Sequence, residues 1–433
     1  MPIYTQRQNT SETKITDHVT KMTGVWRLDS LPSDVLILIF NYCHAFDLVR
    51  LSEVCTRFYD IIHDDTLWKK RSNQPLVTNQ ASAKFRERCN PLLCLRKKWH
   101  VSHNWQYGRY KKKFIFSQKA KLMPWLQLTD DILWWSGGDR LCGFRRSEPL
   151  RGTVLVFNEN DIGSDICKFV VKDEYIVSGH RDGSLKFWTK AKRGDDHICF
   201  SIDRAHSSDV NAVDKIGQII VSGAGDGIVK VWKLPNRRYT EPALASINVR
   251  DRIWSVVADP TGLKFAVGSS GNGDGPPLNI FDIECCSISD IVKHNWRRGA
   301  GILDMVWDNP HTLLTCGYDT YIRKWDMRCG MCVSSWADPT SATLYCISSD
   351  YQHTLVSGTQ FNCKAVLWDQ RQKHYIQLYF MNLRMSSPIY SISFDSCHLY
   401  GATDQHLAEL TFSGYSYEEI NYREMLTYEF VHV

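Results

Sequence analysis

The 433-residue sequence predicts a mainly β protein: a seven-bladed β-propeller preceded by a small α-helical domain and a basic connector. Over the last three quarters of the chain, strand-like segments repeat with a period of about 44 residues, and each repeat carries an aromatic residue at the same place. Residues 31–70 show helical periodicity instead, and residues 69–121 are strongly basic. A period of about 40–45 residues with four strands per unit is typical of propeller blades. The repeated aromatic residues are Phe144, Trp188, Trp232, Phe281, Trp325, Trp368 and Phe412.

Residues 210–232 show the pattern of one unit most clearly. Two short apolar strands, Val210–Val213 and Ile219–Val221, precede the tight turn Gly225-Asp226-Gly227, where glycine tolerates positive φ. A third strand ends on Trp232 and a fourth follows it. A sheet of this kind cannot bury both faces alone. Neighbouring sheets are therefore expected to pack on one another, and closure of the ring removes exposed ends.

Seven repeats predict seven blades in a closed ring. Five of the six gaps are 43 or 44 residues, and the one gap of 49 contains the insertion GNGDGPP, so no blade is missing. Two segments compete for the outermost strand of the last blade. One is Phe114–Ser117, ahead of the first blade, and the other is Tyr428–Val433, at the end of the sequence.

These units resemble WD repeats. His206, Ser222, Asp226 and Trp232 match the hydrogen-bonded His–Ser–Asp–Trp network of that family, and Trp325-Asp326 and Trp368-Asp369 supply its characteristic dipeptide. Most other units lack the Gly-His pair, and Phe replaces Trp in three. The resemblance implies a WD-repeat propeller in which the His and Asp residues form a buried structural network rather than an acid–base site.

The composition limits the class of protein. Hydrophobic residues make up 43% and charged residues 23%, which is ordinary for a globular chain of several folding units. No apolar run approaches the roughly 18 residues that span a bilayer, so no membrane partner is expected. Fifteen cysteines, an odd number and mostly single, favour a reducing compartment and hence a cytoplasmic or nuclear location.

Catalytic and metal-binding motifs are weak. One CxxC pair, Cys329 and Cys332, follows a repeat aromatic residue where a turn is expected, and a second pair at zinc spacing is missing. Neither a GxSxG motif nor a glycine-rich phosphate loop after a strand is present. We therefore expect no catalytic residues, no metal and no cofactor.

Residues 31–70 predict a small helical domain. Pro32 suits a first helical turn, and Leu36, Ile39 and Phe40 form one apolar face of the helix that follows. A second helix begins after Asp47. Forty residues make a small core, so some of the large apolar side chains are expected to stay exposed until a partner covers them.

The same residues resemble an F-box, with Cys43 at a place where that family more often has leucine. The resemblance implies that the domain docks on the Skp adaptor of a cullin–RING ubiquitin ligase. An F-box followed by WD repeats is the architecture of the F-box/WD-repeat family, whose members are non-catalytic substrate receptors. The expected adaptor-binding residues are Leu31, Pro32, Ile39, Phe40, Leu48, Leu51, Val54, Cys55, Phe58, Leu67 and Trp68.

Residues 69–121 carry fifteen Lys or Arg and one acidic residue, a net charge of +14 that leaves −9 for the rest of the chain. A helix is expected around Ala83–Leu95, followed by chain that packs under the propeller because Trp99 and Trp105 would be costly to leave in water. A solvated basic face, a nuclear-import signal and a less favoured nucleic-acid site remain open for this connector. The expected divisions are a flexible leader at 1–27, the F-box at 28–72, the connector at 73–121 and the propeller at 122–433.

The substrate is expected to bind in turns between second and third strands and in loops that lead into first strands. Arginines there suit a phosphorylated protein segment. Two other functions remain open: a WD-repeat scaffold outside ubiquitin transfer, and nucleic-acid binding through the connector. The candidate substrate-binding residues are Arg181, Arg250, Arg252, Arg297, Arg298 and Phe361.

Overall fold

The computed structural model describes residues 27–71, 75–92, 94–117, 119, 123–146, 153–157, 164–189, 199–234, 242–290, 292–382, 386–415 and 417. The chain divides into two compact units, which are described separately: Met1–Gln74 with Leu93–Trp99, and Pro75–Leu92 with His100–Val433. Residues 1–26 of the expected leader and the segment Tyr428–Val433 lie outside the described residues.

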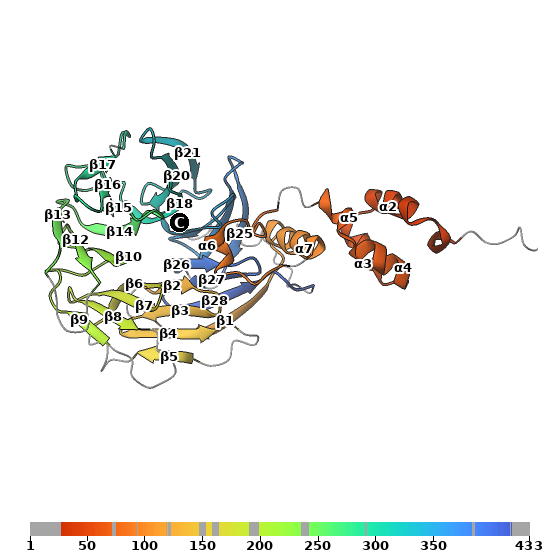
Figure 1. Ribbon diagram of the computed structural model, residues 1–433, viewed down its shortest axis with the longest axis horizontal. Helices are drawn as coiled ribbons and strands as arrows, with labels where there is room; N and C mark the ends of the chain where they lie inside the picture. The colour runs from red at the N-terminus through yellow and green to blue at the C-terminus, as the bar shows by residue number, and fades with distance from the viewer. Residues whose placement is uncertain are drawn as a thin grey trace, which may run out of the picture. The chain divides into compact units, whose positions relative to one another are not determined.

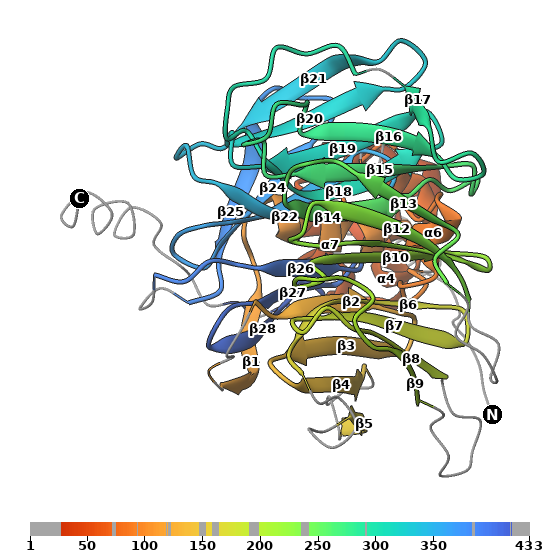
Figure 2. The same cartoon turned by 90° about the vertical axis from the view of Figure 1, so that its left-hand side faces the viewer.

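The larger unit is a ring of seven four-stranded antiparallel sheets (Figure 1), which confirms the predicted propeller. Consecutive sheets lie side by side around the ring. In Figure 2, β5 lies at the bottom of the propeller and β21 at the top. Six blades use consecutive strands of the chain. They are β2–β5 (Trp125–Leu128, Ile132–Gly137, Arg140–Arg145, Thr153–Phe157), β6–β9 (Ile166–Lys172, Tyr175–His180, Leu185–Thr189, Cys199–Ile202), β10–β13 (Ala212–Ile216, Ile219–Gly223, Ile228–Lys233, Ala245–Asn248), β14–β17 (Ile253–Ala258, Lys264–Ser269, Leu278–Asp282, Ile288–Asp290), β18–β21 (Ile302–Asn309, Thr312–Gly317, Tyr321–Asp326, Met331–Ala337) and β22–β25 (Leu344–Ser349, Thr354–Thr359, Lys364–Asp369, Tyr375–Phe380).

The seventh blade joins the two ends of the ring. Its strands β26 (Ser391–Phe394), β27 (His398–Ala402) and β28 (His406–Thr411) are completed by β1 (Lys111–Ser117), which comes from ahead of the first blade. β1 runs antiparallel to β28, with Lys111 opposite Thr411 and Ser117 opposite His406. The outermost strand of this blade is therefore Lys111–Ser117, the first of the two alternatives.

The repeated aromatic residues occupy one position on the third strand of each blade, with one exception. In six blades the residue stands opposite the second residue of strand two, as Trp232 does opposite Ile220. In the seventh blade that pair is Leu399 and Leu410, so Leu410 holds the repeat position and the assignment of Phe412 was wrong. The ring of Phe412 stacks instead on Trp105 of the connector, with 3.8 Å between centroids.

The predicted His–Ser–Asp–Trp network is present in the third blade. The Trp232 indole N–H donates to Ser222 Oγ at 2.9 Å, and Ser222 Oγ lies 2.8 Å from His206 Nε2. His206 Nδ1 is 3.3 Å from Asp226 Oδ2, whose carboxylate also accepts backbone N–H groups of the adjoining turns. Burial lowers the pKa of His206 to about 4 against the opposing influence of Asp226. The ring is therefore neutral and structural at pH 7.

The connector differs from its predicted form. The helix expected at Ala83–Leu95 is only the short α6 (Ala83–Arg86), and the longer helix, α7 (Leu95–Gln106), starts where the expected one ends. The Asn90-Pro91 pair explains the break, since the residue before a proline is driven out of helical geometry.

Within the larger unit, the connector is part of the propeller core. Trp105 packs against Tyr379, Phe394 and Phe412, and its indole N–H donates to Ser396 O at 2.9 Å. Val77 N donates to Thr354 Oγ1 at 2.9 Å. Ser396 and Thr354 lie at turns between first and second strands, so the connector covers the face opposite the candidate substrate-binding loops.

The smaller unit is a cluster of short helices, as predicted. Its helices are η1 (Leu28–Ser30), α2 (Ser33–Tyr42), α3 (Ala45–Ser52), α4 (Thr56–His63) and α5 (Asp65–Lys69). Arg71 donates to Phe40 O and Cys43 O at 3.0 Å each, which satisfies carbonyl groups at the end of α2 and complements its dipole.

Candidate functional site

The smaller unit, which we call the F-box unit after the resemblance of its residues, exposes a stripe of apolar side chains along α2. Val35, Leu38, Ile39 and Tyr42 follow the spacing i, i+3, i+4, i+7 and so share one side of the helix, where Leu38 is 62% and Tyr42 93% exposed. The other side of α2 places Leu36 and Phe40 in the core of the unit. A ten-residue helix that is apolar on both sides has one side left for a partner.

Five of the eleven predicted adaptor-binding residues are buried in the core of the unit. Phe40 meets Phe58 edge to face with 5.2 Å between ring centroids, and the Trp68 indole N–H donates to Ile62 O at 2.6 Å. Such side chains hold the shape of the unit but are not available for contact. The five are Phe40, Leu48, Phe58, Leu67 and Trp68, each 4% exposed or less.

The other predicted adaptor-binding residues are accessible to different degrees. Pro32, Ile39 and Val54 are exposed, whereas Leu31, Leu51 and Cys55 are partly buried against the core. The prediction left out Val35, Leu38 and Tyr42, although their helical spacing was present in the sequence. The sequence analysis assigned a single apolar face to this helix, but α2 has two. The sequence alone did not show which side faces the core and which faces solvent.

The six candidate substrate-binding residues all lie in loops on one face of the propeller. In an antiparallel blade, the turn between strands two and three and the loop into the next blade lie at the same end of the sheet. Arg181 and Phe361 occupy turns of the first kind. Arg250 with Arg252, and Arg297 with Arg298, occupy equivalent loops of neighbouring blades.

These arginines do not form one free cationic cluster. Arg252 is already paired with Asp209, and its guanidinium lies 4.7 Å from the ring centroid of Trp254. Arg181 Nη1 is 4.0 Å from Asp165 Oδ2. Arg250, Arg297 and Arg298 are exposed. Among the six residues, the structure therefore offers three exposed arginines, two arginines that face carboxylates and the exposed ring of Phe361.

A second feature of this face was missed in the sequence: bulges at the start of the innermost strands. The register of four innermost strands shifts around one unpaired residue each, and a bulge of this kind turns a side chain out of the sheet. Tyr390 holds a comparable position just before β26. At three of the four strand starts, the signal was an aliphatic residue followed by another large apolar one, as in Ile253-Trp254. The four bulge residues are Cys167, Trp254, Leu303 and Tyr345.

Two aromatic residues of this group are in contact, and Tyr318, in the turn after β19, belongs to the same loop face. Tyr345 and Tyr390 meet edge to face with 5.5 Å between centroids, and the charge of Arg252 acts on the Tyr318 hydroxyl. Burial raises the pKa of Tyr318, Tyr345 and Tyr390, which keeps the phenols neutral. The Trp254 indole N–H is buried and has no hydrogen-bond partner among the described residues. We call Trp254, Tyr318, Tyr345 and Tyr390 the aromatic rim.

The candidate metal motif at Cys329 and Cys332 lies in and just after a turn. Gly330 has a φ of +67° and donates its N–H to Asp326 O at 2.8 Å, and β21 begins at the next residue. Over the described ranges, no group of three or more His, Cys, Asp or Glu side chains is placed to hold a metal ion. In the same ranges, no helix is long and apolar enough to cross a membrane.

A helical F-box unit and a seven-bladed WD propeller on one chain define the class of F-box/WD-repeat proteins, and comparison with known families supports this. An F-box-like family model matches residues 28–74, and the model of the WD domain, G-beta repeat, matches residues 198–233. A chain in a crystal structure of the mitotic checkpoint complex shares the propeller fold, with a TM-score of 0.54 at 12% identity over 72% of this chain and 95% of that one.

The chain belongs to the F-box/WD-repeat family. It is 32% identical to human F-box/WD repeat-containing protein 4 over 397 residues, which cover 90% of this chain and 93% of the human protein. The mouse protein of the same name is 32% identical over 400 residues, with the same coverage. The resemblance to F-box/WD-repeat proteins is thereby confirmed.

Proposed function

We propose that this chain is the substrate-recognition subunit of a Skp–cullin–F-box ubiquitin-protein ligase. The F-box unit docks on the Skp adaptor, the propeller binds a protein substrate, and other subunits transfer ubiquitin and mark the substrate for proteasomal degradation. The observation that carries the proposal is the exposed α2 stripe in a chain of this family that also holds a complete propeller. The chain itself catalyses no step.

Burial of the α2 stripe supplies the adaptor affinity. Leu38 and Tyr42 project furthest from the unit, and they are held in place by Leu36 and Phe40 on the opposite side of the same helix. A few central apolar or aromatic anchors carry most of the energy of such interfaces, at about 2 kcal/mol or more for each.

The propeller loop face supplies the substrate site. The aromatic rim suits an apolar or aromatic side chain of a peptide, because its rings are neutral and partly buried. The exposed Arg250, Arg297 and Arg298 suit acidic or phosphorylated residues beside that side chain. Phosphatase treatment of a captured substrate checks the second part, since unchanged affinity would exclude a phosphate among the recognised groups.

The adaptor step is tested by co-purification from cells with the proteasome inhibited. The double variant Leu38→Ala, Tyr42→Ala should lose the Skp adaptor and, with it, the cullin. Tyr59→Ala is the matched control, because it removes an exposed tyrosine from α4 of the same unit. Recovery of both partners at wild-type yield with the double variant would contradict the proposal.

The same purification separates the alternative functions. A WD-repeat scaffold acting outside ubiquitin transfer would retain its propeller partners and lack the cullin in wild-type form. Nucleic-acid binding through the connector predicts an affinity that falls steeply with salt. The basic run Arg96-Lys97-Lys98 belongs to the smaller unit, and Lys111-Lys112-Lys113 belongs to the larger one. We place the protein in the cytoplasm or nucleus, where the ligase works.

A further inference from the structure

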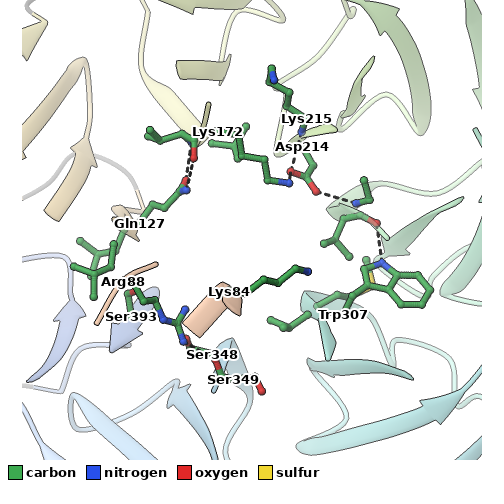
Figure 3. Close-up of a pocket in the computed structure, with 18 of the residues that line it drawn as sticks. Lys84, Arg88, Gln127, Lys172, Asp214, Lys215, Trp307, Ser348, Ser349 and Ser393 are labelled. Carbon is green, nitrogen blue, oxygen red and sulfur yellow. Dashed lines mark hydrogen bonds and ion pairs between the residues drawn. The ribbon is translucent and has the colours of Figure 1, made fainter. Parts of the chain in front are cut away.

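The innermost strands of the propeller surround an open cavity of about 890 Å³ (Figure 3). Residues from the innermost strand of all seven blades line it, together with residues of the connector at and after α6. The lining also reaches turns between first and second strands, such as Asp173 and Pro260. The cavity therefore belongs to the face opposite the aromatic rim. Its size is that of sites for small organic molecules, which are about 300–1,000 Å³.

An ion pair in the lining of the cavity joins two blades that are not neighbours in the ring. Lys168 on β6 and Asp304 on β18 come from the second and fifth blades, and their Nζ and Oδ1 atoms are 3.5 Å apart. Lys168 Nζ also lies 3.9 Å from the ring centroid of Trp125 in the first blade. The ion pair therefore links the second and fifth blades across the ring.

Three carboxylates along the wall of the cavity are already bonded. Asp214 accepts from Lys172 Nζ at 2.6 Å and from the backbone N–H groups of Lys215 and Ala258 at 2.8 Å each. Asp259 accepts several backbone N–H groups of its own turn. Asp304 holds Lys168 and the N–H of Ile347. These acidic groups have little capacity left for a cationic ligand.

Lys84, in contrast to these carboxylates, is not bonded to an oppositely charged side chain among the described residues. It extends from α6 into the cavity, whose lining also includes Lys172 and Asp214 (Figure 3). Its ammonium lies 5.3 Å from the ring centroid of Tyr351, and no hydrogen bond or ion pair with another described residue accompanies that contact. Burial, and next the charge of Lys172, lower the pKa of Lys84, while Asp214, Glu87 and Asp259 act more weakly in the other direction.

An anion in the cavity would offset the positive charge of the partly buried Lys84 and its repulsion by Lys172. A phosphate or carboxylate group between Lys84 and Lys172 replaces the repulsion of two ammonium groups by two charge-assisted hydrogen bonds. Arg88 adds positive charge at the wall, because its Nη2 donates to the Ser349 carbonyl and not to a carboxylate. The hydroxyls of Ser348 and Ser393 are part of the same lining and suit the polar remainder of a ligand.

We propose that this axial cavity binds a small organic anion, and that Lys84 and Lys172 contact its phosphate or carboxylate group. The site is built jointly by the connector and the propeller, since Lys84 comes from the first and Lys172 from the second. Occupancy would tie the connector to the blades. The proposal does not depend on ubiquitin transfer, so its failure leaves the receptor function untouched.

The test uses the purified full-length chain with pyrophosphate and citrate as probes, at constant ionic strength. Lysine labelling read by mass spectrometry should show Lys84 protected about threefold at a probe concentration of twice Kd, with Lys233 unaffected. Protection by pyrophosphate alone identifies a phosphate ligand, and protection by citrate alone identifies a carboxylate. Equal labelling of Lys84 with and without both probes would overturn the proposal.

Variants give an independent measurement. Thermal stabilisation by the effective probe should be lost in Lys84→Gln and kept in Lys233→Gln, which removes an exposed lysine from the outside of a blade. Glu87→Gln should tighten binding, because the carboxylate of Glu87 competes electrostatically with the anion for Lys84. Stabilisation of the same size in Lys84→Gln and wild type would reduce the effect to a general response to salt and refute the site.

Discussion

Phe40→Ala should unfold the F-box unit, whereas Leu38→Ala on the same helix should leave it folded. The Phe40 side chain is 0% exposed and packs edge to face on Phe58. Truncation of a buried phenylalanine costs about 3–5 kcal/mol. A core of this size supplies only about 3–5 kcal/mol in total. Leu38 is 62% exposed, so its loss should change stability by about 0.5 kcal/mol or less.

Hydrogen exchange followed by mass spectrometry separates the two outcomes peptide by peptide. A loss of about 3 kcal/mol accelerates exchange by at least about a hundredfold, which should appear in peptides of α2 and α4. Peptides of the propeller blades serve as the internal reference in each sample. Both variants should lose adaptor binding, but only Phe40→Ala should lose protection. Unchanged protection of α4 in Phe40→Ala would show that the assignment of Phe40 to the core is wrong.

Three further predictions concern the propeller. Trp105→Ala should lower the free energy of unfolding of the propeller unit by about 3–5 kcal/mol, measured by chemical denaturation, because the indole fills a cavity against Phe412 and bonds Ser396. Ser222→Ala should cost about 1–3 kcal/mol in the same assay, since two buried groups lose their partner. His206 has a pKa of about 4 when folded and an ordinary value near 6.5 when unfolded. The unfolded state therefore binds more protons between those values, and stability should fall as pH drops from about 6.5 towards 4. A melting temperature independent of pH in that window would contradict a neutral buried His206.

Local patterns were sufficient for the blade count and for the helical nature of residues 33–69. A repeat of about 44 residues and a helical period both arise from side chains close together in sequence, so they can be read without a structure. The wrong register at Phe412 has a tertiary cause. Leu410 and Phe412 are both large, apolar and on alternating positions, and only the pairing of β28 with β27 shows which one holds the repeat position. Phe412 stacks instead on Trp105, a residue of the connector far away in the sequence.

For the binding surfaces too, some features follow from the sequence and others only from the tertiary structure. The sequence by itself determined the family, the number of blades, the loops that form one face and the presence of excess apolar residues in the F-box. Only the tertiary structure decided that Phe40 and Trp68 are core while Leu38 and Tyr42 are exposed, that β1 closes the ring, and that Lys84 enters the axial cavity. Each of these depends on contacts between residues far apart in the chain. A local period determines which side chains share a face, but what that face meets is set by the packing of the whole unit.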